Sequence, residues 1–187
     1  MAPLRMTLGP LELLHSSHRT LLKLGIPHGL VGGWAVIAWG RVRATRDLDW
    51  LAVIPASRRK EVMAAFAPFG APEWRPPGED DPIMGLIRMV PGSSEDASID
   101  ILMADKAADR IALSRCIDVV LGGGPIPTVR PEDIIAMKLQ AGGGLDLEDA
   151  RALLNSQAGA LDEGLLSEAC RARRVGALLG RIRSGGV

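Results

Sequence analysis

The feature that most constrains this chain is an acidic entry into an apolar strand. Asp47-Leu48-Asp49 leads directly into an apolar run that ends at Ile54. This pattern predicts a central strand that is polar only where it begins. Side chains two residues apart in a strand lie on the same face, so Asp47 and Asp49 should project together, about 7 Å apart between their Cα atoms. Carboxylates at the margin of a core are costly unless a partner compensates them.

A third carboxylate is expected close to this pair. The segments 84–90 and 97–103 read as two strands of an antiparallel hairpin, and the second carries Asp100 between Ile99 and Ile101. The two isoleucines should lie on the opposite face from Asp100. Three carboxylates from two strands form a ligand set for two Mg²⁺ ions about 4 Å apart, which clamp the attacking and leaving oxygens in a displacement at phosphorus.

Gly32-Gly33 follows a short apolar run, predicted as a strand over 28–31, and opens a helix predicted over 34–40. Glycine permits close approach of a ligand to the backbone, and the N–H groups at a helix start favour an anion. No GxGxxG or GxxxxGK[ST] pattern occurs, which argues against dinucleotide and P-loop sites. From the residues alone an alternative stays open, in which Asp47 and Asp49 form an ordinary strand entry paired with Arg43 and Arg46.

Composition limits the classes of function. With 187 residues and 47% hydrophobic content, the chain can bury one core with a small helical appendage. Its 22 basic and 22 acidic residues cancel, so no overall charge indicates a nucleic-acid or membrane-surface protein. The N-terminus lacks a signal-peptide pattern, and no apolar run reaches the roughly 20 residues of a membrane span. We expect a cytoplasmic protein with no membrane partner.

The periodicity predicts an α+β fold, a mixed β-sheet flanked by helices and followed by a C-terminal helical segment. Residues 1–130 should form the α/β core with an N-terminal covering helix, and residues 131–187 a helical subdomain packed on it. The remaining core elements are expected as helices over 10–23, 57–66 and 105–114, a long loop over 68–82, and strands over 117–121 and 126–129. The helical segment is expected as helices over 131–141, 146–155 and 161–182.

Taken together, the apolar run, Gly32-Gly33, thirteen further residues and Asp47-Leu48-Asp49 resemble the signature of the nucleotidyltransferase superfamily related to DNA polymerase β. The finer pattern VGGWAVIAWGRVRATRDLDWL is similar to the branch of abortive-infection type nucleotidyltransferase toxins. The resemblance covers residues 28–105 and a second block, PEDIIAMKLQAGGGLDLEDARALL, at 131–154.

The resemblance implies a mixed sheet with the acids at the sheet edge. The implied activity is transfer of a nucleoside monophosphate from a nucleoside triphosphate (NTP) to a hydroxyl, with two Mg²⁺ or Mn²⁺ ions. By the same likeness Asp47 and Asp49 bind both ions, while Asp100 binds the catalytic ion and accepts the proton of the hydroxyl. The implied nucleotide-binding residues are Gly32, Gly33, Arg43, Thr45 and Lys138.

The second block supports two interpretations. Lys138 shares a helix face with Ile134 and Ile135, where a lysine can extend its amine to solvent without any function. Asp146 and Asp149 have the spacing of an N-cap and its reciprocal N3 partner, and on the residues alone capping is favoured. The resemblance instead assigns Lys138 to the triphosphate and makes Asp149 a tentative member of the site.

The acceptor is left open by the sequence. An RNA 3′ end, a protein or a small molecule could supply the hydroxyl, and an RNA would meet the C-terminal arginines Arg171, Arg173, Arg174, Arg181 and Arg183. The toxin likeness implies an antitoxin protein as a partner. One alternative function is a non-catalytic binding or antitoxin-like module of the same fold, and another is a two-metal nuclease using the same acids.

Overall fold

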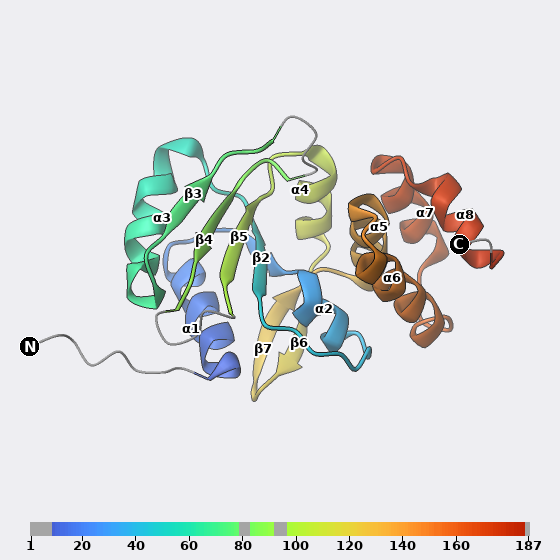
Figure 1. Cartoon of the computed structure of the whole chain (residues 1–187), viewed down its shortest axis with the longest axis horizontal. Coiled ribbons are helices and arrows are strands. Elements are labelled where there is room, and N and C mark those ends of the chain that lie inside the picture. Colours follow the sequence, from blue (N-terminus) through green and yellow to red (C-terminus); the bar gives the residue numbers. More distant parts are fainter. Residues whose placement is uncertain (1–8, 79–82, 92–96, 186–187) are drawn as a thin grey trace, which may run out of the picture.

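A computed structural model describes residues 9–78, 83–91 and 97–185. Its centre is one seven-stranded sheet with the strand order β3-β4-β5-β2-β1-β7-β6 (Figure 1). The strands are β1 (His28–Leu30), β2 (Leu48–Ala52), β3 (Glu73–Arg75), β4 (Leu86–Met89), β5 (Ile99–Met103), β6 (Ile117–Leu121) and β7 (Gly124–Thr128). The sheet is mixed, because β2 pairs parallel with β5 and antiparallel with β1. The predicted α+β class is confirmed.

Helices cover both faces of the sheet (Figure 1). On one face lie α1 (Pro10–Lys23) and α3 (Arg59–Phe66), which follows the 3₁₀ turn η1 (Ala56–Arg58). On the other lie α2 (Gly32–Ala38), α4 (Ala107–Ser114) and α5 (Pro131–Ala141). The strand β2 has side chains that contact the helices on each face of the sheet. Trp50 is fully buried and donates its indole N–H to Ser17 of α1, so its neighbour Asp49 faces the α2 and α5 side.

The sequence of α1 explains its boundaries. Pro10 occupies the first turn, where a missing N–H costs nothing, and Glu12 accepts a hydrogen bond from the Gly9 N–H. Leu14, Ser17 and Leu21 form its buried stripe. The predicted helix over 10–23 is therefore confirmed.

The C-terminal helices gather at one end of the molecule (Figure 1). After α5 come α6 (Gly144–Ser156), α7 (Glu163–Ala172) and α8 (Gly176–Arg183). The prediction of one helix over 161–182 is wrong. Arg174 has a φ of +60°, and the Val175 N–H returns to the Cys170 carbonyl, which ends α7 before α8 begins.

The prediction of a loop over 68–82 is also wrong in part. It contains the 3₁₀ turn η2 (Ala67–Phe69) and the short edge strand β3, which pairs antiparallel with β4. Trp74 on β3 lies under the Arg59 guanidinium, 3.6 Å from the ring centroid. This cation–π contact gives the segment an anchor that the local sequence does not indicate. The rest of the loop, residues 79–82, lies outside the described residues.

The predicted hairpin is confirmed, since β4 and β5 pair antiparallel. Most of its connecting turn, residues 92–96, lies outside the described part of the chain. Within the described ranges, no helix combines the length and apolar character needed to cross a membrane.

Candidate active site

Strand register brings the predicted acids to one face of the sheet. Asp49 on β2 is the direct partner of Asp100 on the parallel strand β5, and Asp47 precedes Asp49 by two residues. Register partners in a parallel pair project to the same side, so Asp49 and Asp100 both face the side covered by α2 and α5. Asp47 lies just before β2, near enough for its charge to act on Asp49. The acids do not lie at the sheet edge, as the resemblance implied. They lie where the two central strands begin.

Gly32 is required because the Asp49 carboxylate packs directly on it. A Cβ at Gly32 would overlap the carboxylate, and the φ of +63° at this residue favours glycine independently. The Gly33 N–H hydrogen-bonds the Asp49 side chain. The Gly-Gly turn therefore contacts the carboxylate of Asp49, an anion of the protein itself. The sequence did not reveal this contact.

The electrostatic environment of Asp49 is unfavourable for its charge. Burial, then the charges of Asp100 and Asp47, raise the pKa of Asp49 to about 7. Lys138 and the Gly33 N–H offset only part of this effect. Negative charge is therefore concentrated at this position, where a cation would relieve it.

Asp47 and Asp100 have different partners. The Asp47 carboxylate is exposed and accepts hydrogen bonds from the Ser98 N–H at 3.0 Å and the Ser98 hydroxyl at 2.9 Å. Asp100 is buried and binds Arg88 of β4 through both oxygens, with the Arg88 Nε 2.8 Å from Asp100 Oδ1. The hydrogen bond to Asp100, together with the charges of all three acids, raises the pKa of Arg88.

Arg88 was missed by the sequence analysis. It is the antiparallel register partner of Asp100, which places the two side chains on one face. The alternation of β4 could have suggested a polar face, but the register across the hairpin depends on a turn that the sequence does not define.

The acids fit a divalent cation by their chemistry. Mg²⁺ prefers carboxylate oxygens, and burial together with the charges of Asp100 and Asp47 disfavours the charged form of Asp49 when no cation is near. The described residues contain no three His, Cys, Asp or Glu side chains already arranged to hold a metal ion. Arg88 already binds the carboxylate of Asp100, although each carboxylate oxygen has a second lone pair that can bind another partner.

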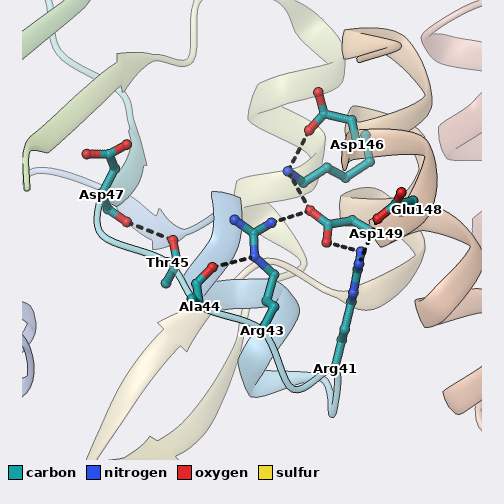
Figure 2. A network of polar contacts seen from close by, with 9 residues as sticks. Arg41, Arg43, Ala44, Thr45, Asp47, Asp146, Glu148 and Asp149 are labelled. Atoms are coloured by element: carbon teal, nitrogen blue, oxygen red, sulfur yellow. Dashed lines mark hydrogen bonds and ion pairs between the residues drawn. The ribbon is translucent and has the colours of Figure 1, made fainter. Parts of the chain in front are cut away.

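A second cluster contains the predicted residues Lys138, Arg43 and Asp149, and Figure 2 labels the last two. Asp149 of α6 is completely buried, accepts a hydrogen bond from Arg43 Nη1 at 2.6 Å and forms an ion pair with Lys138 Nζ at 3.0 Å. Arg41 Nη1 binds its other oxygen. The alternative in which Arg43 pairs with the strand-entry acids is not what the structure shows, because Arg43 pairs with Asp149.

The capping interpretation of Asp146 and Asp149 is wrong. The N-cap of α6 is Gly143, so both aspartates lie inside the helix. Asp146 instead accepts a hydrogen bond from Lys138 Nζ at 2.7 Å. The three glycines before Asp146 allowed the helix to begin earlier than the capping pattern indicated.

Thr45 lies between the two clusters (Figure 2). Its hydroxyl donates to the Asp47 carbonyl at 3.5 Å, and a Cβ at Gly33 would overlap it. The same Cβ would lie 3.1 Å from Arg43 Nη2. Gly33, Thr45 and Arg43 therefore lie together, as predicted for nucleotide-binding residues, although their function stays a prediction.

A cavity of about 240 Å³ adjoins both clusters. Its polar lining includes Asp49, Lys138 and Asp146, and its apolar lining includes Leu51 and Met137. Arg173 also lines it.

The C-terminal arginines do not form one free basic surface. Arg173 is buried and donates to Asp109 at 2.7 Å and to Gln140 at 2.8 Å. Arg183 pairs with Glu163 at 2.8 Å. The predicted RNA-facing patch is thus reduced, since two of its five members serve contacts within the protein.

Sequence comparison and structure comparison give different results. No family model matches the sequence, and no curated protein matches it. The solution structure of the antibiotic-resistance factor ANT(2'')-Ia matches 94% of this chain and 96% of its own, with 19% identity and a TM-score of 0.59. An antigenic nucleotidyltransferase-like protein from Paracoccidioides brasiliensis matches 91% of this chain and 88% of its own, with 15% identity and a TM-score of 0.58.

The chain has the nucleotidyltransferase fold. The lincomycin-bound lincosamide antibiotic adenylyltransferase LnuA has it too, matching 78% of this chain and 96% of its own, with 17% identity and a TM-score of 0.51. These matches show the fold that the resemblance of the Gly-Gly and Asp-Leu-Asp patterns implies. They do not distinguish the abortive-infection toxin branch, which stays a prediction.

Proposed function

We propose that this protein is a metal-dependent nucleotidyltransferase that transfers a nucleoside monophosphate from an NTP to a hydroxyl. The observation that carries the proposal is the register of Asp49 with Asp100 on the central strands of a nucleotidyltransferase fold, with the charge of Asp47 acting on Asp49. The rest of the predicted site lies in the cluster around Asp149 and beside the Gly-Gly turn. Phosphoryl transfer needs positioned charge rather than a covalent nucleophile, which suits this set of residues.

The residues have separate roles in the proposed reaction. Asp47, Asp49 and Asp100 hold Mg²⁺ or Mn²⁺, which when bound neutralises charge on the transferring phosphoryl group. Arg43, Thr45 and Lys138, with the Gly-Gly turn, bind the triphosphate. The acceptor oxygen forms a bond to the α-phosphorus while the bond from that phosphorus to the pyrophosphate oxygen breaks. The acceptor proton passes to Asp100.

A small molecule is the acceptor we favour. A solved structure of ANT(2'')-Ia holds adenylyl-2''-tobramycin, and the LnuA structure holds lincomycin. The cavity beside Asp49 has the lining of a small-molecule pocket, apolar with a few polar groups. An RNA 3′ end or a protein hydroxyl, and with them a toxin role and an antitoxin partner, are the competing acceptor classes.

The direct test incubates the full chain with each labelled NTP and Mg²⁺. Acceptors are a panel of aminoglycosides and lincosamides, total RNA, and cell extract protein. We expect label on a small molecule with the wild type and none with Asp49→Ala. Equal labelling by a folded Asp49→Ala variant would overturn the proposal, and label on RNA or protein would correct the acceptor.

One observation favours a second candidate, a non-catalytic binding module. Arg88 engages both oxygens of Asp100, as a permanent substitute for a metal ion would. Calorimetry separates the candidates, because a catalytic site should bind at least one NTP together with Mg²⁺. Absence of heat with all four nucleotides would favour the binding module.

A further inference from the structure

The Asp149 carboxylate binds three cations from two distant parts of the chain (Figure 2). Arg41 and Arg43 come from the loop between α2 and β2, and Lys138 comes from α5. Asp149 is 0% exposed, whereas the three cationic side chains are between 14% and 19% exposed. A fully buried carboxylate requires partners of this kind, because removing it from water is otherwise costly.

The three cations of the cluster are matched in number by three carboxylates, and of these three only Asp149 is fully buried. Asp146 binds Lys138 at 2.7 Å and Glu148 binds Arg41 at 3.3 Å. They are 28% and 62% exposed, so solvent screens their charge more strongly than that of Asp149. A phosphate group can therefore compete with these two acids for the cations.

Two of the cations, Arg43 and Lys138, are also held with N–H groups beside the proposed site. Arg43 uses Nη1 on Asp149 and Nε on the Ala44 carbonyl, which leaves its Nη2 edge beside Gly33. Lys138 has three N–H donors; it donates a hydrogen bond to Asp146 and forms an ion pair with Asp149. Lys138 also lines the cavity that contains Asp49 and Gly32. Asp149 thus sets where both cations are presented.

We propose that Asp149 is a positioning residue that holds Arg43 and Lys138 at the spacing required for the polyphosphate of the nucleotide. This rests on the proposed function and adds the residue that prepares its phosphate subsite. Asp149 acts through the two cations and does not itself contact the substrate. Holding the donors in place before binding spares the nucleotide the entropy of ordering two long side chains.

Asp149 also joins distant parts of the chain, since Arg41 and Arg43 lie 108 and 106 residues from it in sequence. A purely structural tie would affect stability and leave phosphate affinity unchanged in the folded protein. The two roles are therefore separated by measuring phosphate affinity on variants that are shown to be folded.

The test compares the full-length wild type with Asp149→Asn and with the control Glu148→Gln. Glu148 is the adjacent acid, is largely exposed and contacts only the edge of the cluster at Arg41. Calorimetry with Mg²⁺ and inorganic triphosphate measures the phosphate subsite without the base or acceptor. We expect Asp149→Asn to weaken triphosphate binding at least tenfold and to raise the KM for NTP more than it lowers kcat. Glu148→Gln should stay within twofold of the wild type.

Asp149→Glu provides a second variant in case Asp149→Asn does not fold. It keeps the charge and moves the carboxylate by one methylene, and we expect binding to weaken at least fivefold in a folded protein. A folded variant at Asp149 with wild-type triphosphate affinity overturns the positioning role alone. A wild type that neither binds triphosphate with Mg²⁺ nor transfers a nucleotide overturns the proposed function, and the positioning role with it.

Discussion

Arg88 and Asp100 face each other across the antiparallel pair of β4 and β5, and the guanidinium takes both oxygens of the carboxylate. This contact places a cation of the protein within the field of all three acids. It makes the acid cluster compatible with folding in the absence of any bound ion. A metal ion bound at the proposed site would share the charge of Asp100 with Arg88.

Arg88→Gln should destabilise the fold by about 2 kcal/mol, because it leaves Asp100 buried without its partner. Mg²⁺ should restore part of that loss if the acids bind it. Urea denaturation with and without Mg²⁺ measures both effects. Arg75→Gln is the matched control, since Arg75 and Glu73 form an exposed pair on β3 and the change should cost less than 0.5 kcal/mol.

Asp49→Asn should abolish nucleotide transfer and yet stabilise the fold. At pH 8 the Asp49 side chain is charged while buried near Asp47 and Asp100, and its pKa of about 7 means that it is mostly neutral at pH 5.5. Because the folded pKa of about 7 is above the unfolded one, Asp49 should reduce stability as pH rises from about 4 to about 7, with little further change above that. The variant should gain on the order of 2 kcal/mol at pH 8 and little at pH 3.5, where the side chain is neutral in both states. Equal gains at both pH values would contradict this explanation.

Gly32→Ala should destabilise the protein by about 2 kcal/mol or more and impair NTP binding. The new Cβ would overlap the Asp49 carboxylate, at a residue whose φ is +63°. Gly144→Ala is the control, because nothing lies within 4 Å of a Cβ there and its φ is not positive. Thermal unfolding and calorimetric titration of both variants test the difference.

His18 and His28 form a hydrogen-bonded pair on the face of the sheet opposite the acids. We expect this pair to make the stability of the protein sensitive to acid. His28 Nδ1 bonds the Ile26 carbonyl at 2.7 Å, so its Nε2 accepts from His18 Nδ1 at 2.8 Å. Burial lowers the pKa of both rings; for His18, His15 and Arg19 add to this effect and Asp118 opposes it. The unfolded chain then binds more protons, so stability should fall as pH drops below about 6.5.

His28→Gln isolates this contribution. The difference in unfolding free energy between wild type and variant, measured from pH 7.5 to 5, should change in favour of the variant as pH falls. A difference that is constant with pH would show that the ring pair does not titrate on unfolding.

The sequence predicted the fold well because the fold depends on local pattern. The acidic entry at Asp47 and Asp49, the lone Asp100 in an apolar strand, and Gly32-Gly33 are visible in short stretches, and the structure pairs Asp49 with Asp100 in register. Arg88 and β3 could not be predicted, because each depends on the register of a distant strand. The partners of Asp149 were hidden for the same reason, and only its likeness to a family motif selected it.

Paired residues of the candidate site lie far apart in the sequence, which affects the order in which the parts of the site form. Asp47 meets Ser98 from 51 residues away, and Arg41 meets Asp149 from 108 residues away. Long-range contacts of this kind form late, because closing a long loop costs entropy before any contact stabilises it. During synthesis the sheet can form before α6 emerges, whereas the cluster at Asp149 cannot. A growing chain therefore acquires the strands that carry the acids first and the proposed phosphate subsite later.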